Sequence, residues 1–273
     1  MMRVPSPAKL NLFLHITDRR SDGYHELQSI FQLIDLYDWL TFTPLNDKHE
    51  IEIEGIAQVD LTQNLIYRAA QLLKPYATKY CGLHILIEKN IPMGAGLGGG
   101  SSNAATTLRV LNSLWECSLT IDQLADLGLS LGADVPIFVY GKNAWAEGVG
   151  EKLTFVDLDQ KQYIVLKPDC FISTQLLFSQ KTLTRDSKRT TFCAYQMKPS
   201  DFGNNFEALA RSLYPEVEEA MQYLDQFGSA QLTGTGACVF TEVTSDMNVN
   251  EIVTHAPCKA YVVHGLKQSP LCL

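Results

Sequence analysis

A glycine-rich segment is the first feature of this chain that could carry chemistry. Five of the seven residues from Gly94 to Gly100 are glycine, within PMGAGLGGGSSN at residues 92–103. Such a run costs conformational entropy, but it lets the backbone approach a ligand closely and turn its N–H groups toward it. A strand pattern precedes the segment, and a helix pattern with Ser101 and Ser102 in its first turn follows it. Since a helix N-terminus attracts anions, the segment predicts a phosphate-binding loop.

Three other interpretations of this loop can be compared with that one. A Walker A loop requires a lysine directly after its last glycine, whereas Gly100 follows Gly99 here. Gly94, Gly96 and Gly99 match the spacing of a dinucleotide fingerprint. That fold then needs a strand ending in an acidic residue, but residues 120–131 have a helical pattern. A flexible linker rarely combines dense glycine with flanking strand and helix patterns. A phosphate cradle of a different class fits best.

Lys9 and Asp134 could supply the remaining groups for phosphoryl transfer. That reaction needs positive charge at the transition state and a group that orients or deprotonates the acceptor hydroxyl. Taken singly, a lysine at a strand start is usually solvated, and an aspartate after a helix is more often a turn or capping residue. Their occurrence together with the glycine loop favours a catalytic role. No Ser/His/Asp arrangement, paired catalytic cysteine or histidine cluster in the sequence offers a rival chemistry.

Hydrophobic periodicity predicts the elements that position these residues. Residues 9–16 have leucine or isoleucine at 10, 12, 14 and 16. This alternation predicts a strand with one apolar face and places Lys9 and Asn11 together on the other face. Further expected elements are a turn at Asp22-Gly23, strands at 27–43, 51–53, 81–88, 137–140 and 144–146, and helices at 64–73, 101–115 and 121–131, the last with a Thr120/Gln123 capping box and a stop at Gly132. Asp134 would then lie between a helix end and an apolar strand.

The C-terminal part mixes helices and strands without regular βαβ repetition. Residues 179–204 are polar and mildly basic with no clear period, which predicts a long irregular loop whose charges form a solvated face. The expected elements after it are helices at 205–213, 215–226 and 249–255, two strands around a Gly-Thr-Gly turn across 229–243, and a strand at 259–265. This pattern favours an α+β fold in two domains, residues 1–155 and 156–273.

Composition limits the class of protein further. The chain has 273 residues, 46% hydrophobic and 19% charged, as in an ordinary globular protein. A net charge of −8 argues against nucleic acid as a partner, because phosphate backbones require clustered Lys and Arg. The seven cysteines are scattered without a C-x-x-C pair, which favours reduced thiols. No signal peptide or membrane-length apolar run occurs, so we expect a soluble, cytoplasmic protein with no membrane partner.

Four ordered motifs resemble those of the GHMP kinase superfamily, which includes galactokinase, homoserine kinase and mevalonate kinase. The glycine segment matches the central motif P-x-x-x-G-L-G-S/G-S/G-S, and the others are PSPAKLNLFL from Pro5, followed by RSDGYHEL from Arg20, LGADVP from Leu131 and LTGTGACVF from Leu232. The resemblance covers nearly the whole chain. It is strongest to members that phosphorylate the 2-hydroxyl of a cytidine-diphosphate-linked methylerythritol in non-mevalonate isoprenoid synthesis. It implies an N-terminal domain like the second domain of ribosomal protein S5, a ferredoxin-like C-terminal domain, and ATP and Mg²⁺ as cofactors.

The resemblance also implies roles for residues at matching positions. Lys9 and Asp134 would be the catalytic pair, Asp134 accepting or orienting the proton of the acceptor hydroxyl and Lys9 stabilising the developing charge. The ATP site would consist of Asn64, Leu65 and Lys89 around the adenine, and of Pro92, Met93, Gly94, Ala95, Gly96, Leu97, Gly98, Gly99, Gly100, Ser101 and Ser102 in the loop. The substrate would be held by Asn11, Tyr24, His25, Thr174, Phe178, Thr235 and Gly236. Among these, the residues that would bind the cytosine are Tyr24, His25 and Phe178.

The chain departs from the family pattern at two places. The family commonly reads P-T-x-x-x-F around Thr174, whereas Ser173 stands here in place of the proline. The local backbone can therefore differ, although Thr174 and Phe178 are kept. No residue matches the acidic magnesium ligand of the superfamily, so no metal ligand is assigned to the protein itself. Magnesium is expected to bind through ATP phosphates and water, with Ser102 as a candidate ligand.

Two other functions stay open on the sequence. The first is a kinase of the homoserine or mevalonate type, which the Asp-Gly-Tyr-His segment at residues 22–25 disfavours because those acceptors carry no base to stack. The second is a non-catalytic nucleotide-binding protein on the same scaffold, which the presence of both Lys9 and Asp134 disfavours. A small molecule is the expected partner in every case, and the protein is expected to be a monomer or a weak homodimer.

Overall fold

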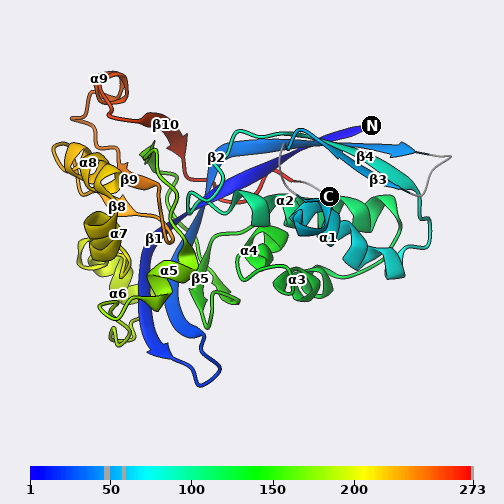
Figure 1. Ribbon diagram of the computed structural model, residues 1–273, viewed down its shortest axis with the longest axis horizontal. Helices are drawn as coiled ribbons and strands as arrows, with labels where there is room; N and C mark the ends of the chain where they lie inside the picture. Colours follow the sequence, from blue (N-terminus) through cyan, green and yellow to red (C-terminus); the bar gives the residue numbers. More distant parts are fainter. Residues whose placement is uncertain (46–49, 57–59, 272–273) are drawn as a thin grey trace.

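Two β-sheets, each covered by helices, make up the protein (Figure 1). The computed structural model describes residues 1–45, 50–56 and 60–271. The first sheet has the order β3-β4-β2-β5-β6, with β1 also paired to β2. Its strands are β1 (Met2–Arg19), β2 (His25–Leu45), β3 (Ile51–Glu54), β4 (Gly82–Glu88), β5 (Ala144–Glu147) and β6 (Lys152–Phe155). The mixture of helices with largely antiparallel sheets confirms the predicted α+β class.

The long antiparallel hairpin of β1 and β2 runs through the whole molecule (Figure 1). The predicted Asp22-Gly23 turn closes it, and the Asp22 carboxylate there accepts a hydrogen bond of 3.1 Å from the Tyr24 N–H. A β-bulge between Asn11 and Leu14 shifts the register, and a bulge re-aims the side chains that follow it. The side chains of β1 before and after the bulge therefore pack against different parts of the protein.

The prediction of a single apolar face on β1 is wrong, because this strand is buried on both faces. Leu10 packs in one cluster with residues of the second sheet, including Val165, whereas Leu14 and Ile16 lie in another cluster among C-terminal helices. Phe13, expected on the polar face, is 1% exposed. An alternating pattern predicts a strand with one buried face, whereas in β1 further parts of the protein bury the other face as well.

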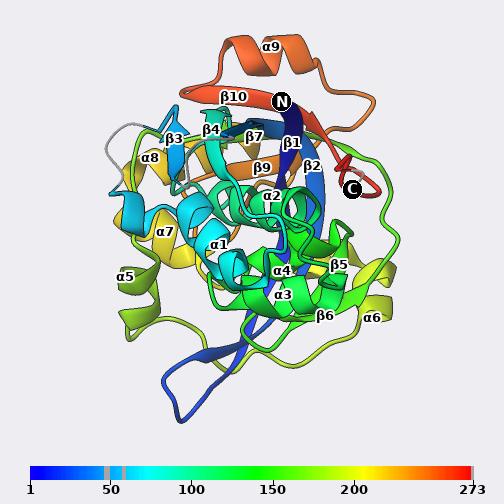
Figure 2. The ribbon, with the colours of Figure 1, turned by 90° about the vertical axis from the view of Figure 1, so that its right-hand side faces the viewer.

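Helices α1 to α4 lie on one side of the first sheet (Figures 1 and 2). Their bounds are α1 (Leu65–Leu73), α2 (Gly99–Leu114), α3 (Ile121–Leu129) and α4 (Val135–Tyr140), with short 3₁₀ turns η1 (Leu61–Gln63) and η2 (Lys74–Tyr76). The predicted Thr120/Gln123 capping box is present at α3. Helix α2 begins at Gly99, two residues before its predicted start, so the end of the glycine segment forms its first turn.

Residues 135–140 form helix α4 and not the predicted strand. All residues from Val135 to Val139 are buried, and a short apolar run buried all round has no period that separates helix from strand. Two local signals favour the helix: Pro136 in its first turn and Gly141 in the left-handed conformation after its last residue. Asp134 consequently stands at the start of a helix, not between a helix end and a strand.

The second sheet has the order β10-β7-β9-β8, which is the 4-1-3-2 order of its strands along the chain. Its strands are β7 (Gln162–Lys167), β8 (Gln231–Leu232), β9 (Val239–Glu242) and β10 (Lys259–His264). The helices of this part are α5 (Thr174–Ser179), α6 (Phe192–Met197), η3 (Pro199–Asp201), α7 (Glu207–Leu213), α8 (Pro215–Leu224) and α9 (Val249–Thr254). The resulting β-α-β-β-α-β succession is the expected ferredoxin-like arrangement.

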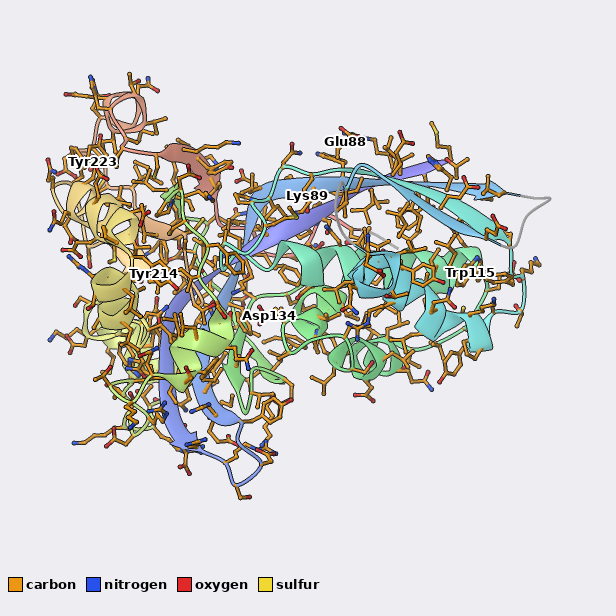
Figure 3. All side chains as sticks on the ribbon, viewed as in Figure 1. Glu88, Lys89, Trp115, Asp134, Tyr214 and Tyr223 are labelled. Carbon is orange, nitrogen blue, oxygen red and sulfur yellow. The ribbon has the colours of Figure 1, made fainter. Side chains whose placement is uncertain are left out.

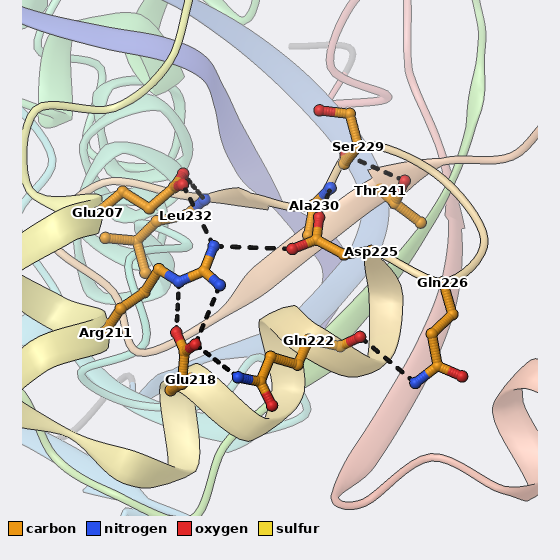
Figure 4. A network of polar contacts seen from close by, with 10 residues as sticks. All are labelled: Glu207, Arg211, Glu218, Gln222, Asp225, Gln226, Ser229, Ala230, Leu232 and Thr241. Atoms are coloured by element: carbon orange, nitrogen blue, oxygen red, sulfur yellow. Dashed lines mark hydrogen bonds and ion pairs between the residues drawn. The ribbon is translucent and has the colours of Figure 1, made fainter.

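An ion-pair network around Arg211 joins α7 and α8 to this sheet (Figure 4). The Arg211 guanidinium contacts the Glu218 carboxylate through two nitrogens and lies 3.6 Å from Asp225 and 3.9 Å from Glu207. Glu207 accepts a hydrogen bond of 3.4 Å from the N–H of Leu232, the residue before the Thr-Gly-Thr-Gly turn. Burial raises the pKa of the Glu207 carboxyl.

The segment 179–204 is more ordered than predicted, since it contains α6 and η3. Arg185, expected on a solvated face, is partly buried and donates hydrogen bonds to His25 Nε2 and to three backbone carbonyls. The chain passes from the first sheet to the second between β6 and β7. One apolar cluster, which includes Leu10 and Tyr163, contains residues from both sheets, and the division into domains at residue 155 stays a prediction.

Candidate active site

Two neighbouring cavities share the glycine segment as a wall. The first, of about 400 Å³, is lined by Lys9 and Asp134 and is called the Asp134 cavity. The second, of about 370 Å³, is lined by Lys89 and is called the Lys89 cavity. Gly94, Gly96 and Gly98 line both cavities, so the two cavities adjoin at these glycines. Groups bound in the two cavities would therefore lie beside the same stretch of backbone.

Most residues predicted for the ATP site line the Lys89 cavity. They are Asn64, Leu65, Lys89, Pro92, Met93, Gly94, Ala95, Gly96, Gly98, Gly99, Gly100 and Ser101. Two predicted residues do not: Leu97 is 1% exposed and packs in the core, and Ser102 is fully buried with its Oγ 2.8 Å from that of Ser6. Because its hydroxyl is enclosed and already paired, Ser102 no longer qualifies as a candidate magnesium ligand.

Lys89 is held by a buried carboxylate that the sequence did not single out. Its Nζ lies 2.5 Å from Asp38 Oδ2 and donates a hydrogen bond of 2.8 Å to the Ile91 carbonyl. The other oxygen of Asp38, a fully buried residue, accepts 2.8 Å hydrogen bonds from the N–H groups of Asn90 and Ile91. A carboxylate with this many partners is a stable anchor in the interior. Asp38 thereby fixes the strand end from which the glycine segment departs, beside the Lys89 seen in Figure 3.

Lys9, Asn11 and Asp134 meet at the floor of the Asp134 cavity. The Lys9 Nζ donates to Asn11 Oδ1 and, at 2.9 Å, to the Gly96 carbonyl, and it lies 3.6 Å from Asp134 Oδ2. Burial lowers the pKa of the Lys9 ammonium, and the neighbouring Asp134 opposes this shift. The Asp134 side chain is 36% exposed, so its carboxylate faces the cavity while Lys9 stays behind it. The prediction that Lys9 and Asn11 share one side of the strand is confirmed.

A carboxylate with one buried cation behind it can orient or accept the proton of a bound hydroxyl. The ammonium of Lys9 supplies positive charge where a transferring phosphoryl group would need it. Among the described residues, no group of three or more His, Cys, Asp or Glu side chains could hold a metal ion.

Two glycines of the loop allow this close assembly. Gly98 has φ +72°, and a Cβ there would lie 2.8 Å from Phe138 Cζ and 3.2 Å from Lys9 Cε. Gly96 has φ +76°, and a Cβ there would lie 2.1 Å from the Thr233 carbonyl oxygen. Left-handed φ and missing space together make any larger residue costly at both positions.

The turn Thr233–Gly236 reaches the loop from the second sheet. Thr233 Oγ1 accepts a hydrogen bond of 3.0 Å from the Asn11 N–H and donates one of 3.4 Å to the Gly96 carbonyl. Thr235 and Gly236, two predicted substrate residues, line the Asp134 cavity. Asn204 holds the turn from behind, donating 2.8 Å hydrogen bonds to the carbonyls of Leu232 and Gly234. The candidate site is therefore assembled from residues of both sheets.

Of the three predicted aromatic residues, Phe178 lines this cavity, whereas Tyr24 and His25 do not. Thr174 and Phe178 line it, and Thr174 Oγ1 lies 2.8 Å from Thr235 Oγ1 despite the missing proline. The rings of His25 and Phe178 are stacked, with centroids 4.8 Å apart. Tyr24 is 64% exposed on the hairpin turn and lines neither cavity. The structure thus brings Phe178 and His25 together but not Tyr24.

Several residues of the site were missed from the sequence. Ser29 accepts a hydrogen bond of 2.8 Å from the Asn11 amide and lines the Asp134 cavity with Phe31 and Phe171. Phe171 is 71% exposed, and exposure of so large an apolar side chain beside a cavity is itself a signal. Ser29 and Phe31 stand in an apolar strand pattern, in which nothing distinguished them from core residues.

Comparison with known proteins agrees with this geometry. The model of the GHMP kinases N terminal domain matches residues 64–142, and the model named GHMP kinases C terminal matches residues 193–263. The chain belongs to the GHMP kinase family. The resemblance that the four motifs predicted is confirmed, and this GHMP kinase is an ATP-dependent small-molecule kinase.

Two of the relatives most similar to this GHMP kinase share a name. The 4-diphosphocytidyl-2-C-methyl-D-erythritol kinase of Acinetobacter baylyi is 82% identical over 99% of this chain and 98% of its own length. The protein of the same name from Acinetobacter baumannii is 78% identical over 99% of this chain and 98% of its own. A solved structure titled as a 4-(cytidine 5'-diphospho)-2C-methyl-D-erythritol kinase superposes with a TM-score of 0.82 at 30% identity and covers 97% of this chain and 100% of that one.

Proposed function

We propose that this GHMP kinase transfers the γ-phosphoryl group of ATP to the 2-hydroxyl of 4-diphosphocytidyl-2-C-methyl-D-erythritol, giving the 2-phosphate and ADP in non-mevalonate isoprenoid synthesis. The observation that carries the proposal is the 82% identity to a relative of that name over 99% of the chain. The pair of cavities supports it, because one can take the nucleotide and the other an acceptor joined to a base.

In this proposal the nucleotide occupies the Lys89 cavity. Asn64, Leu65 and Lys89 would surround the adenine, and the glycine segment with the start of α2 would hold the phosphates through backbone N–H groups. Mg²⁺ would be held by the phosphates and water, as this ion usually keeps several waters in nucleotide sites. It would neutralise charge on the phosphates when bound.

The acceptor would occupy the Asp134 cavity, with its 2-hydroxyl at the Asp134 carboxylate. Asp134 would orient and accept the hydroxyl proton as the oxygen attacks, and Lys9 would stabilise the charge that develops on the transferred group. Asn11 would hold the substrate beside them. The remaining proposed substrate contacts are Tyr24, His25, Thr174, Phe178, Thr235 and Gly236, and Tyr24 would have to turn inward from its exposed position to cover the base.

A coupled ADP-release assay tests the proposal. The purified protein with ATP and Mg²⁺ should release ADP when 4-diphosphocytidyl-2-C-methyl-D-erythritol is added, with phosphate appearing on the 2-hydroxyl. Mevalonate, homoserine and galactose serve as matched acceptors without a base. Turnover of one of these three, with none of the cytidine-linked acceptor, would replace the proposal by a GHMP kinase of the type that uses that acceptor.

The cellular setting is proposed on the same basis. None of the helices in the described residues is long and apolar enough to cross a membrane. We propose that the protein works in the cytoplasm as a monomer or weak homodimer, without nucleic acid as a partner. Analytical ultracentrifugation at several protein concentrations tests the assembly state.

A further inference from the structure

Arg185 makes a contact with His25 that only one form of the imidazole allows. The Arg185 Nε donates to His25 Nε2 over 3.1 Å. A guanidinium has donors and no acceptor, and it stays charged at every physiological pH. The His25 nitrogen that faces it must therefore be the unprotonated one. In a neutral imidazole the proton then sits on Nδ1.

The surroundings of His25 keep it in this neutral form. The residue is 8% exposed, and its ring is stacked against Phe178. The charged groups that act on it are the guanidinium of Arg185, from the segment after α5, and that of Arg19, its cross-strand neighbour in the hairpin. Burial first, and then these two cations, lower the pKa of His25. Protonation would also place an Nε2–H against the N–H of Arg185, so the contact would be lost.

Arg185 itself is held in place by other bonds. Its Nη1 donates to the Leu183 carbonyl at 3.0 Å, and its Nη2 donates to the carbonyls of Phe178 and Gln180 at 2.9 and 2.7 Å. These bonds fix the guanidinium relative to Phe178, whose ring lines the Asp134 cavity. The hydrogen bond that the His25 ring makes to the described residues is the one at Nε2, and none is made by its Nδ1. His25 lines neither cavity itself, but its ring stacks on Phe178, which lines the Asp134 cavity. An imidazole N–H donor without a protein partner therefore lies beside that cavity.

We propose that Arg185 fixes the tautomer of His25 and thereby makes this kinase selective for a base that offers a hydrogen-bond acceptor. The inference rests on the proposed function, in which His25 and Phe178 contact the base. Cytosine has an acceptor at ring nitrogen N3, where uracil has an N–H donor. A histidine free to exchange tautomers could match either edge, donating in one form and accepting in the other. An imidazole that accepts at Nδ1 carries its proton on Nε2, and with Arg185 present this Nε2–H would face the Nε–H of Arg185. This tautomer is therefore disfavoured, and His25 cannot pair with the N–H donor of uracil.

The tautomer is tested first, by NMR of protein labelled with ¹⁵N and ¹³C in histidine, with the His25 signals assigned from their loss in a His25→Phe protein. In the unsubstituted protein His25 should be neutral with its proton on Nδ1, and it should resist protonation at pH values where exposed histidines titrate. In Arg185→Met the Nε2–H form should appear, and the pKa should rise toward its ordinary value. An Nε2–H or charged His25 in the unsubstituted protein at pH 7 would overturn the proposal, whatever the variant does.

Selectivity is tested second, as the ratio of kcat/KM for the cytidine-linked substrate to that for its uridine-linked analogue. Arg185→Met should lower this ratio about tenfold or more, the equivalent of one hydrogen bond, mainly by improving the uridine analogue. Arg185→Lys keeps a donor and a charge and should restore the ratio. Arg189→Met, which removes an exposed arginine of the same segment, is the matched control and should leave the ratio unchanged.

The outcomes separate the two proposals. If no cytidine-linked substrate is turned over, the proposed function fails, while the NMR result still decides the tautomer. If the substrate is turned over and the Arg185→Met ratio equals that of the unsubstituted protein, the selectivity role of Arg185 is refuted. A general disturbance of the fold would lower turnover of both substrates together and leave the ratio unchanged, which also counts against the proposal.

Discussion

Replacing Gly96 by alanine tests whether the contact between the glycine loop and the Thr233–Gly236 turn is as tight as the structure implies. An alanine at φ +76° costs about 1–2 kcal/mol for its left-handed backbone. Its Cβ would also lie 2.1 Å from the Thr233 carbonyl oxygen, so the turn must retreat by about 1 Å. Overpacking of this kind costs about 1–3 kcal/mol. The expected loss of stability is the sum, about 2–5 kcal/mol, a large part of an ordinary domain's 5–15 kcal/mol.

The same shift should reach the chemistry, because Thr233 Oγ1 is bonded to the Asn11 N–H and the Gly96 carbonyl is bonded to Lys9. A misplacement of about 1 Å at a reacting group can lower kcat about a hundredfold. Urea unfolding measures the first effect, and steady-state ADP release at saturating substrate measures the second. Gly100→Ala is the control for stability, since its φ is ordinary and its Cβ would meet only Leu65 Cδ1 at 3.4 Å. A Gly96→Ala protein as stable and as active as the unsubstituted one would refute the reasoning.

Three further substitutions test other parts of the structure. Asp134→Asn should lower kcat about 10²–10⁴-fold with ATP affinity by calorimetry unchanged, and an unaltered kcat would remove Asp134 from the catalytic step. Glu207→Gln removes a carboxyl whose pKa is raised in the folded protein. The contribution of Glu207 to stability is fully present below the pKa of an unfolded glutamate, about 4.3, and is lost as pH rises through its pKa in the folded protein. The glutamine variant should therefore lose less stability than the unsubstituted protein between about pH 4 and pH 7, and parallel unfolding curves would contradict this. Asn204→Ala frees the buried carbonyls of Leu232 and Gly234, so it should cost about 2 kcal/mol and raise the acceptor KM. A normal KM in a destabilised protein would show that the turn keeps its place without Asn204.

Features encoded over a few neighbouring residues could be predicted from the sequence. The Thr120/Gln123 capping box and the common side of Lys9 and Asn11 follow from local spacing, and both are present. The glycine segment is predicted to be a phosphate cradle from its composition and flanking patterns, and this role stays a prediction. For the capping box and for Lys9 and Asn11, the signal and the structure share the same short stretch of chain.

Features created by distant contacts could not be predicted. Asp38 pairs with Lys89 across 51 residues, and a single aspartate in an apolar strand pattern gives no indication of that partner. Arg185 meets His25 across 160 residues from a segment with no period. Helix α4 was missed for a different reason, because complete burial removed the polar face by which a helix is recognised. Tertiary surroundings decide all three.

The β1–β2 hairpin also has a consequence for how the chain acquires its structure. Strand β1 is synthesised before the other strands, yet some of its hydrogen bonds are to residues much later in the chain. The Ile16 N–H, for example, donates to the side chain of Asn205, 189 positions away. Such distant pairings slow folding, because the entropy cost of closing a long loop comes before the stabilisation from the contacts that it allows. During synthesis, Leu14 and Ile16 therefore stay exposed to solvent until the C-terminal helices that bury them have been made. A chaperone that binds extended apolar segments would find its target in this strand, and the C-terminal half expressed alone would lack the strand that completes its core.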